Sequence, residues 1–325
     1  MIYKASELED LINEAVKAIS MDGSPSNLYN PIHYILSLGG KRLRPLLTLM
    51  SANLYKEDMS QVMPVALGVE IFHNFSLLHD DLMDRADRRR GKLTVHKKWN
   101  DNVAILSGDA MQIVAYQFIA KAPKDVLSNV LNLFSSTAIE VCEGQQYDMD
   151  FENRLDVTEA EYLEMVRLKT AVLIACSLKL GAIVVDAPED DANLLYDFGI
   201  KMGLAYQIKD DLLDVYGNSH VFGKNIGGDI LCNKKTFLLI NALERANPAQ
   251  KEQLVKWINA VDYDPEQKIN VVKNIYDELN LKQISAKAIE RYYLEGLDYL
   301  SKVQVSDERK KELITISETL TYREK

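Results

Sequence analysis

The sequence contains few residues that interrupt helices or form covalent cross-links. Its 325 residues include 15 glycines, 8 prolines and 3 cysteines. The cysteines, Cys142, Cys176 and Cys232, are odd in number and far apart, which predicts reduced thiols in a cytoplasmic protein rather than a disulfide framework. No Gly-, Pro- or Ser-rich linker marks a boundary, so we expect one domain over residues 1–325.

An excess of basic residues is also missing. The formal net charge is −10 and the pI is about 5.1. Such an acidic chain is not expected to bind nucleic acid or an anionic membrane surface, so an anionic ligand would need metal ions or a local Lys and Arg cluster. The most apolar run, VLIACSLKLGAIVV, is short and contains Lys179. It predicts a buried helix, not a membrane span.

No alternating apolar and polar run flanked by turn residues appears, so no β-strand is predicted. Apolar residues instead recur at i, i+3, i+4 and i+7, with few interruptions. The segments with this pattern are residues 7–19, 63–83, 109–122, 125–147, 192–216 and 286–303. The pattern predicts an all-α bundle of long helices.

Aspartates cluster twice at the ends of apolar helical segments, in LLHDDLMD and in IKDDLLD. Asp80 and Asp84 are four residues apart, as are Asp210 and Asp214, so each pair lies on one helix face. Mg²⁺ usually takes one or two protein carboxylates and completes its shell with water and substrate phosphate. Because unpaired carboxylates are costly in apolar surroundings, two such clusters favour a metal-bound polyphosphate site over a solvated acidic face.

Basic residues follow glycines in two interruptions of the helical pattern. GGKRLRP supplies Lys41, Arg42 and Arg44, and DRRRGK supplies three more arginines just after the first aspartate cluster. Guanidinium groups suit bidentate recognition of phosphate. Acids and bases within a few residues of each other predict two bound anions, one held through Mg²⁺ and one held directly by Arg and Lys.

Five motifs occur in order from about residue 30 to residue 240: GGKRLRP, LLHDDLMDRADRRRGKLTVH, RLKTAVL, YQIKDDLLD and FGKNIGGD. Together they resemble the trans-isoprenyl diphosphate synthases, or polyprenyl synthetases, of the short-chain geranylgeranyl or farnesyl type. The resemblance implies the isoprenoid synthase fold, a single-domain helical bundle around a deep central cavity, and a homodimer. The C-terminal third carries no recognisable motif and is expected to be helical filler.

The resemblance also implies a reaction. Such enzymes are head-to-tail prenyltransferases that condense isopentenyl diphosphate with dimethylallyl, geranyl or farnesyl diphosphate and use three Mg²⁺ per active site. The metal ions neutralise the diphosphate leaving group as the allylic C–O bond breaks.

Residue roles follow from matching positions in the family motifs. The implied Mg²⁺ ligands are Asp80, Asp84 and Asp210, and the other catalytic aspartates are Asp81, Asp211 and Asp214. The implied isopentenyl diphosphate site consists of Lys41, Arg44, His73 and Arg90. Contacts to the allylic diphosphate or its reacting end are implied for Arg89, Lys169, Thr170, Gln207, Lys224 and Lys234. Of these six, Lys169, Thr170, Gln207 and Lys224 are also implied to act in catalysis.

Two residues before the first aspartate cluster bear on product length. Phe75 is aromatic and Ser76 is small, and the first cluster has no insertion. This combination resembles geranylgeranyl-type enzymes, so we expect a C20 product ahead of C15, with Phe75 as the floor of the cavity. The loop departs from the family pattern at Leu93, where proline is common, and at Arg88, where an apolar residue is common.

Three other readings explain part of the sequence. A class I terpene cyclase also ionises an allylic diphosphate, but cyclases usually lack GGKRLRP and a second aspartate cluster. A non-catalytic subunit of a heteromeric prenyl synthase would tend to lose aspartates from a cluster, whereas both are complete here. A structural helical protein or divalent-cation buffer would explain the carboxylates but not the basic loops.

Overall fold

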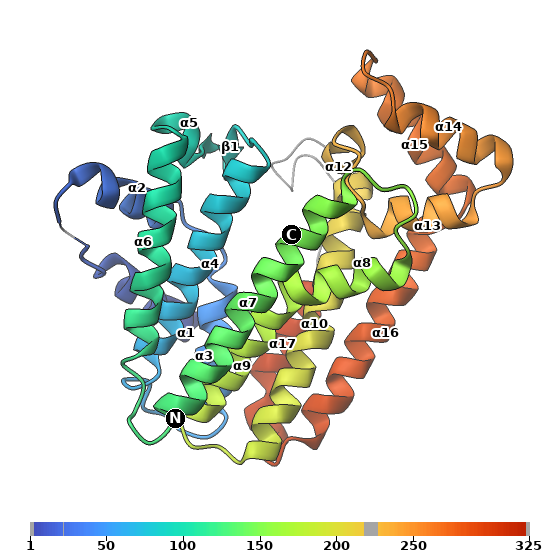
Figure 1. Cartoon of the computed structure of the whole chain (residues 1–325). Helices are drawn as coiled ribbons and strands as arrows, with labels where there is room; N and C mark the ends of the chain where they lie inside the picture. The colour runs from blue at the N-terminus through green and yellow to red at the C-terminus, as the bar shows by residue number, and fades with distance from the viewer. Residues whose placement is uncertain (1–2, 22, 218–226, 323–325) are drawn as a thin grey trace. The chain divides into compact units, whose positions relative to one another are not determined.

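The structure, a computed structural model, describes residues 3–21, 23–217 and 227–322. These residues are helical almost throughout (Figure 1), which confirms the all-α prediction. The helices are α1 (Ala5–Lys17), α2 (Ser26–Ser37), α3 (Leu43–Asn53), α4 (Met63–Met83), α5 (Val95–Lys98), α6 (Asp101–Ile119), α7 (Leu127–Phe151), α8 (Glu159–Val166), a π-helical turn η1 (Arg167–Ala171), α9 (Val172–Val184), α10 (Glu189–Tyr216), α12 (Gly228–Leu231), α13 (Phe237–Arg245), α14 (Pro248–Ile258), α15 (Pro265–Glu278), α16 (Leu281–Lys302) and α17 (Asp307–Tyr322).

One short hairpin contradicts the expectation that the chain has no strands. Strand β1 (Arg88–Arg89) pairs antiparallel with β2 (Lys92–Leu93). The two residues between them, Arg90 and Gly91, have φ of 51° and 76°. A two-residue hairpin turn needs this left-handed backbone at both positions, which glycine adopts readily. Strands of two residues are too short to produce an alternating pattern in the sequence.

The chain divides into two compact units. As far as they are described, the first contains residues 1–135, 176–196 and 303–313, and the second contains residues 136–175, 197–302 and 314–325. Four helices, α7, α9, α10 and α17, contribute residues to both units. The expected single domain over residues 1–325 stays a prediction.

Helix α4 is the central helix of the first unit. It contacts α1, α2, α3, α5 and α6, and every residue from Val65 to Phe72 is buried. A helix that is apolar all round needs neighbours on every side, which explains its central place. The rings of Phe72 and Phe134 meet edge to face with their centroids 5.2 Å apart. The bounds of α4 match the helical pattern predicted for residues 63–83.

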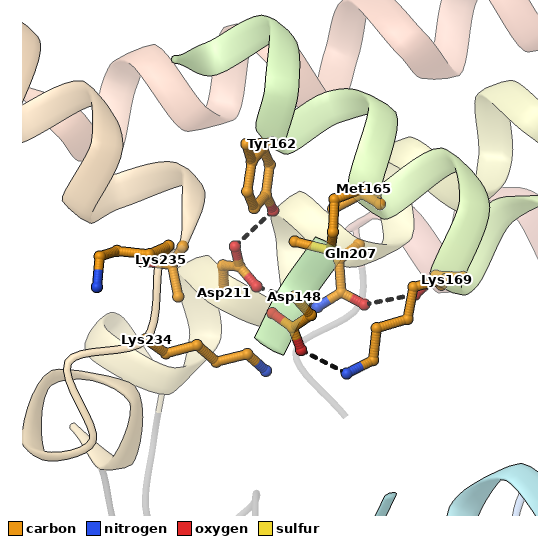
Figure 2. A pocket seen from close by; sticks show the side chains of 11 residues that line it. Asp148, Tyr162, Met165, Lys169, Gln207, Asp211, Lys234 and Lys235 are labelled. Atoms are coloured by element: carbon orange, nitrogen blue, oxygen red, sulfur yellow. Dashed lines mark hydrogen bonds and ion pairs between the residues drawn. The ribbon is translucent and has the colours of Figure 1, made fainter. Parts of the chain in front are cut away.

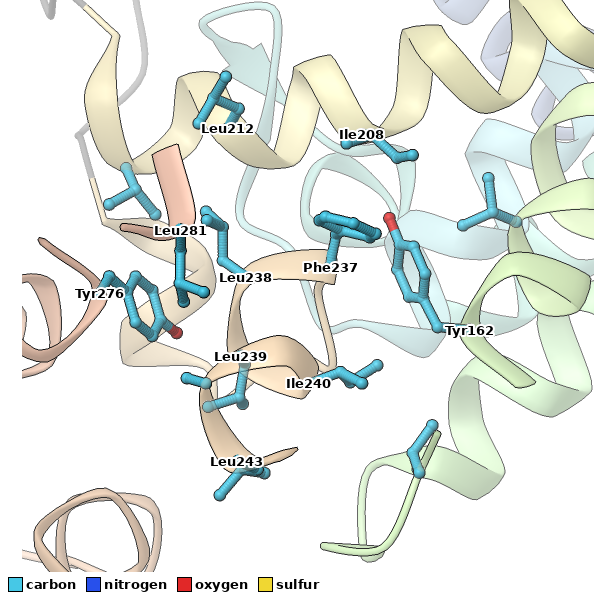
Figure 3. Packing of buried hydrophobic residues seen from close by; sticks show 14 of the residues in the cluster. Tyr162, Ile208, Leu212, Phe237, Leu238, Leu239, Ile240, Leu243, Tyr276 and Leu281 are labelled. Carbon is cyan, nitrogen blue, oxygen red and sulfur yellow. The ribbon is translucent and has the colours of Figure 1, made fainter. Parts of the chain in front are cut away.

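The core of the second unit forms around α13, as Figure 3 shows. Thr236 caps this helix, its hydroxyl accepting a hydrogen bond from the Leu239 backbone N–H. The first residues of α13 are all buried, and they pack among side chains from α8, α10, α15 and α16. The labelled members of this cluster from those four helices are Tyr162, Ile208, Leu212, Tyr276 and Leu281. The site residues of α10 and of the segment before α13 are therefore supported by one packed core.

Within the described residues, none of the helices combines the length and the hydropathy that crossing a bilayer requires.

Candidate active site

The first aspartate cluster lies at the C-terminal end of α4. The helix ends at Met83, and Asp84 donates its backbone N–H to the Asp80 carbonyl at 2.9 Å. Asp80 and Asp84 therefore lie one turn apart on the same side, with the Asp80 side chain 22% exposed and Asp84 exposed. Because the carbonyl end of a helix already carries partial negative charge, two carboxylates there favour a bound cation.

Asp81 of the same cluster points inward and holds an arginine. It is only 3% exposed and accepts a hydrogen bond from Arg89 Nε at 2.7 Å. Arg89 Nη2 also lies 3.6 Å from Asp80 Oδ2. Burial raises the pKa of Asp81, whereas the Arg89 guanidinium acts in the opposite direction. Asp81 thus fixes Arg89, one of the residues implied to contact the allylic diphosphate, beside the Asp80 carboxylate.

The basic loop after α2 presents two cations and buries a third. Lys41 is exposed, and Arg44 Nη1 lies 3.0 Å from His73 Nε2. Arg42 is buried instead, with φ of 44°, 2.5 Å from the Glu70 carboxylate and 2.7 Å from the Leu36 carbonyl. The sequence groups Arg42 with Lys41 and Arg44 as basic residues suited to phosphate, and for Arg42 this interpretation is wrong. Arg42 ties the loop to α2 and α4.

His73 is held neutral by its surroundings. Burial, together with the nearby guanidinium groups of Arg44 and Arg90, keeps the pKa of His73 well below its usual value. Since a guanidinium group only donates hydrogen bonds, Nε2 of His73 must accept the bond from Arg44, which leaves the proton on Nδ1.

The β1–β2 hairpin brings Arg90 to the same loop. Arg90 donates a hydrogen bond to the Gly39 carbonyl, and its guanidinium group occupies the space that a side chain at position 40 would need. Position 40 requires glycine because its φ is 128°, a backbone conformation that other residues rarely adopt. Of the four residues implied to bind isopentenyl diphosphate, Arg44, His73 and Arg90 are brought together in the first unit, and Lys41 lies exposed on the adjoining loop.

Phe75 and Ser76 lie on α4 between His73 and the first aspartate cluster. Phe75 is 8% exposed, and its ring centroid lies 5.4 Å from that of Phe72 and 4.8 Å from that of His79. The Ser76 hydroxyl donates to the His73 carbonyl at 2.8 Å, so it remains within its own helix. Phe75 is thus a packed aromatic residue, and its role in product length stays a prediction.

The second aspartate cluster lies on α10 in the second unit. Its middle residue, Asp211, is buried, as Asp81 is in the first cluster. Asp211 is 2% exposed and accepts hydrogen bonds from Tyr162 Oη at 2.6 Å, Gln207 Nε2 at 3.0 Å and the Phe237 backbone N–H at 3.0 Å. Burial, with a smaller effect of the Asp229 charge, raises the pKa of Asp211 to about 6. Asp211 therefore orients Gln207 and the start of α13.

The outer aspartates of this cluster are half-buried. Asp214 Oδ2 accepts a hydrogen bond from the Asp229 backbone N–H at 3.0 Å, and its own carbonyl accepts one from the Gly227 N–H at 2.7 Å. Asp214 thus holds the start of α12, in keeping with a supporting role. Asp210 lies four residues before it, one turn along the same helix.

The π-helical turn η1 carries Lys169 and Thr170. The Thr170 hydroxyl donates to Gln207 Oε1 at 3.2 Å, and Lys169 Nζ lies 2.5 Å from Asp148 Oδ2 of α7 (Figure 2). A Cβ added at Gly144 would lie 2.2 Å from the Lys169 backbone nitrogen. Only glycine allows α7 to approach η1 this closely. Single π turns within α-helices are often found at functional sites, and this one carries both predicted residues.

These side chains surround a small pocket with a cavity volume of about 30 Å³. Figure 2 shows the Lys234 ammonium group directed toward Asp148, whereas Lys235 extends away. The pocket is lined by Asp148, Tyr162, Met165, Val166, Lys169, Thr170, Gln207, Asp211, Lys234, Lys235 and Thr236. Lys169, Thr170, Gln207 and Lys234 are therefore brought together as the sequence predicts. Lys224, the remaining predicted residue, lies outside the described residues.

Three residues of the site were missed at the level of sequence. Glu70 lies inside a segment predicted as an apolar helix, whereas Asp148 and Tyr162 lie outside the segments predicted from the helical pattern. A charged residue in the middle of the apolar run of α4 was a usable signal for Glu70, because a buried carboxylate needs a partner. The spacing of Gly144 and Asp148, four residues apart on α7, was a weaker signal.

The residues present fit Mg²⁺ bound together with a phosphate ligand. Across the described part of the chain, no group of three or more His, Cys, Asp and Glu side chains could hold a metal ion by itself. Mg²⁺ does not need such a cage, because water and substrate phosphates supply most of its oxygens. Asp80 and Asp84, on one face of α4 and open to solvent, supply the one or two carboxylates it takes from protein.

Comparison with known proteins identifies the family. The sequence profile of the polyprenyl synthetase family matches residues 25–279. Geranylgeranyl pyrophosphate synthase of Geoglobus acetivorans is 37% identical over 306 residues, covering 89% of this chain and 95% of that protein. Geranylfarnesyl diphosphate synthase of Aeropyrum pernix is 36% identical over 304 residues, covering 91% and 94%.

Solved structures give the same result. The crystal structure of a geranylgeranyl pyrophosphate synthase aligns with a TM-score of 0.94 at 44% identity and covers 99% of both chains. The chain belongs to the polyprenyl synthetase family. This confirms the family and the isoprenoid synthase fold that the sequence motifs predicted.

Proposed function

We propose that this protein is a head-to-tail prenyltransferase. It condenses isopentenyl diphosphate with an allylic diphosphate, namely dimethylallyl, geranyl or farnesyl diphosphate, and yields a short-chain all-trans prenyl diphosphate and pyrophosphate. The reaction breaks the allylic C–O bond, forms a C–C bond to the isopentenyl double bond and releases a proton. The proton goes to the departing pyrophosphate, so no protein base is needed.

The observation that carries this proposal is a group of basic side chains around His73 in the first unit. Arg44 contacts His73 on α4, Arg90 lies close enough to act on His73, and Lys41 belongs to the same basic loop as Arg44; Asp80 and Asp84 follow at the end of the same helix. An enzyme that only ionises an allylic diphosphate needs the aspartates but has no use for a second, metal-independent anion site. Arg44 and Arg90 beside neutral His73, with Lys41 on the adjoining loop, suit the diphosphate of isopentenyl diphosphate.

Residues of the second unit would act on the allylic substrate. Lys169 and Lys234 would add fixed positive charge beside the leaving group, in a pocket where charges interact more strongly than in water. In the structure Lys169 pairs with Asp148, which holds it in place until a diphosphate binds. The hydrogen-bonded dipoles of Thr170 and Gln207 would stabilise the allylic cation.

Asp80, Asp84 and Asp210 would hold the metal ions, three Mg²⁺ per active site in our proposal. When bound, Mg²⁺ supplies Lewis-acid neutralisation of the charge that develops on the diphosphate leaving group. Asp81 and Asp211 contribute indirectly, because they fix Arg89 and Gln207.

We expect a C20 product ahead of C15. Phe75 lies five residues, about 7.5 Å along the helix axis, before Asp80, which suits a floor below the reacting end. The geranylfarnesyl diphosphate synthase of Aeropyrum pernix is a relative of this chain at 36% identity, so an assay must also resolve C25.

We also propose that the chain is one synthase domain that works as a homodimer in the cytoplasm. Leu106 and Ile113, seven residues apart on one face of α6, are 60% and 63% exposed. Two large exposed apolar side chains aligned on a helix favour a protein neighbour over water.

The test is a product assay. Purified protein, Mg²⁺ and isopentenyl diphosphate would be incubated separately with dimethylallyl, geranyl and farnesyl diphosphate, and the products sized by mass spectrometry. We expect an elongated linear diphosphate of C20. Cyclic hydrocarbon without elongation would instead indicate a class I terpene cyclase, and no turnover with any primer would indicate a non-catalytic subunit.

A further inference from the structure

A lysine is buried in the C-terminal part of the chain, where the sequence shows no motif. Lys268, on α15, is 1% exposed. Its Nζ donates to Asn233 Oδ1 at 2.7 Å and to the Leu231 carbonyl at 3.3 Å, and it lies 4.4 Å from the centre of the Tyr263 ring. Both acceptors are uncharged. Burying an ammonium group against neutral partners is costly, so a structure that does so needs a reason.

The acceptor, Asn233, forms a turn between α12 and α13. Its φ is 55°, and its backbone N–H donates to the Ile230 carbonyl at 3.2 Å. The side chain uses both ends of its amide, because Nδ2 donates to the Ile258 carbonyl of α14 at 3.0 Å while Oδ1 accepts from Lys268. The turn is therefore attached to both helices of the α14–α15 pair.

The residue after this turn, Lys234, projects into the pocket that holds Lys169 and Asp148 (Figure 2). Its backbone N–H donates to the Asp229 carbonyl at 3.0 Å. The next residue, Lys235, is buried and donates to the Glu152 carbonyl at 2.8 Å and back to the Asn233 carbonyl at 3.3 Å. Lys234 is thus a cation on a short segment that is fixed on both sides. Asn233 before it is held by Lys268, and Lys235 after it is buried and bonded to the Glu152 carbonyl.

We infer that Lys268 is a positioning residue: it holds the Asn233 turn and thereby fixes where Lys234 presents its charge to the allylic diphosphate. The inference rests on the proposed function for the identity of that ligand. If Lys268 has this role, helix α15 contributes to substrate binding although its sequence contains no recognisable motif.

The surroundings of Lys268 separate this role from a purely structural one. The same small cavity is lined by apolar side chains, including Leu254, Trp257 and Val272. A methionine of similar length would fill this space without the cost of desolvating a charge. Fixing the turn requires a donor, however, which methionine lacks.

The experiment compares Lys268→Met and Asn233→Gly with the wild type. Asn233→Gly keeps the left-handed backbone that the turn needs but removes the amide that Lys268 and Ile258 bind. Two quantities would be measured by titration and steady-state kinetics: the affinity for pyrophosphate in the presence of Mg²⁺, and the KM for each substrate. Lys256→Met, which removes an exposed lysine on α14, is the matched control.

We expect both variants to lose about tenfold in pyrophosphate affinity and to raise the KM for the allylic diphosphate about tenfold. The KM for isopentenyl diphosphate should stay unchanged, because its predicted site lies in the first unit. Combining both substitutions should add little, because both break the same contact.

Unchanged pyrophosphate affinity and allylic KM in Asn233→Gly would overturn the proposal, and this holds even if Lys268→Met fails to fold. Equal losses for both substrates would also overturn it, because they indicate a general weakening of the fold. A wild-type protein that binds pyrophosphate but transfers no prenyl group would refute the proposed function, whereas the pyrophosphate affinities of the variants would still decide the role of Lys268.

Discussion

At the scale of single residues, chemically similar side chains take opposite roles. Arg42 and Arg44 are two residues apart, yet Arg42 is buried against Glu70 and Arg44 faces His73. Within each aspartate cluster the middle residue, Asp81 or Asp211, is buried and accepts hydrogen bonds from neighbouring site residues. The buried members orient the groups that would meet substrate, so substituting them should disturb binding indirectly.

His73 should make stability depend on pH. The unfolded chain takes up a proton on this residue near its usual pKa of about 6.5, whereas the folded protein resists protonation because burial and nearby arginines lower the pKa of His73. Its contribution to stability is therefore fully present above pH 6.5 and is lost as the pH falls below it. We expect His73→Gln, whose amide oxygen can still accept from Arg44, to lose about 1 kcal/mol less between pH 7.5 and pH 5.5 than the wild type.

Urea unfolding at the two pH values measures this difference. If the variant loses as much free energy of unfolding as the wild type, His73 is not the group responsible.

Phe75 should limit the length of the product. Replacing it with alanine removes a ring that packs on Phe72 and His79 and opens space along α4. We expect Phe75→Ala to shift the main product from C20 to C25 or longer in the product assay, with a loss of stability of about 3–5 kcal/mol from the cavity. Ser76→Ala, which removes only a hydroxyl bonded within its own helix, is the control. An unchanged product from Phe75→Ala would contradict its role as the floor.

At the scale of helices and strands, the site depends on irregular segments. The η1 turn places Lys169 and Thr170, the β1–β2 hairpin delivers Arg90, and the turn at Asn233 carries Lys234. Each irregular segment is supported by a regular helix that packs against it.

The contact between α7 and η1 should not tolerate a side chain. In Gly144→Ala the new Cβ would lie 2.2 Å from the Lys169 nitrogen, so η1 must shift. We expect a loss of about 1–3 kcal/mol in stability and a raised KM for the allylic diphosphate, both measurable by thermal unfolding and kinetics.

Gly296→Ala on α16 is the matched control. Its Cβ would meet nothing closer than 3.4 Å, so higher helix propensity should leave stability unchanged or raise it by about 0.5–1 kcal/mol. Equal effects of the two substitutions would contradict the conclusion that the close approach of α7 to η1 requires glycine at position 144.

At the scale of the whole molecule, the proposed homodimer depends on α6. Replacing Leu106 and Ile113 with glutamate puts two charges on its exposed apolar face. We expect the mass in solution, measured by light scattering after size exclusion, to fall from twice 36.9 kDa to 36.9 kDa. Leu294→Glu, which alters an exposed leucine on α16, should leave the mass unchanged. A dimer that survives the α6 substitutions would place the interface elsewhere.

The sequence by itself determined the helical class, the bounds of α4 and the pairing of Asp80 with Asp84 on one face. These features depend on periodicity and spacing within one helix, which the order of residues specifies directly. The ordered motifs also determined the family, and with it the predicted roles of residues far apart in the chain.

Only the tertiary structure decided which charged residues face the site and which support it. Arg42 is buried because Glu70, 28 residues away, meets it from another helix. Lys268 reaches Asn233, 35 residues away, from a region in which the sequence contains no recognisable motif. Whether a cation binds substrate or holds a loop depends on partners brought close by packing, and local periodicity does not encode those partners.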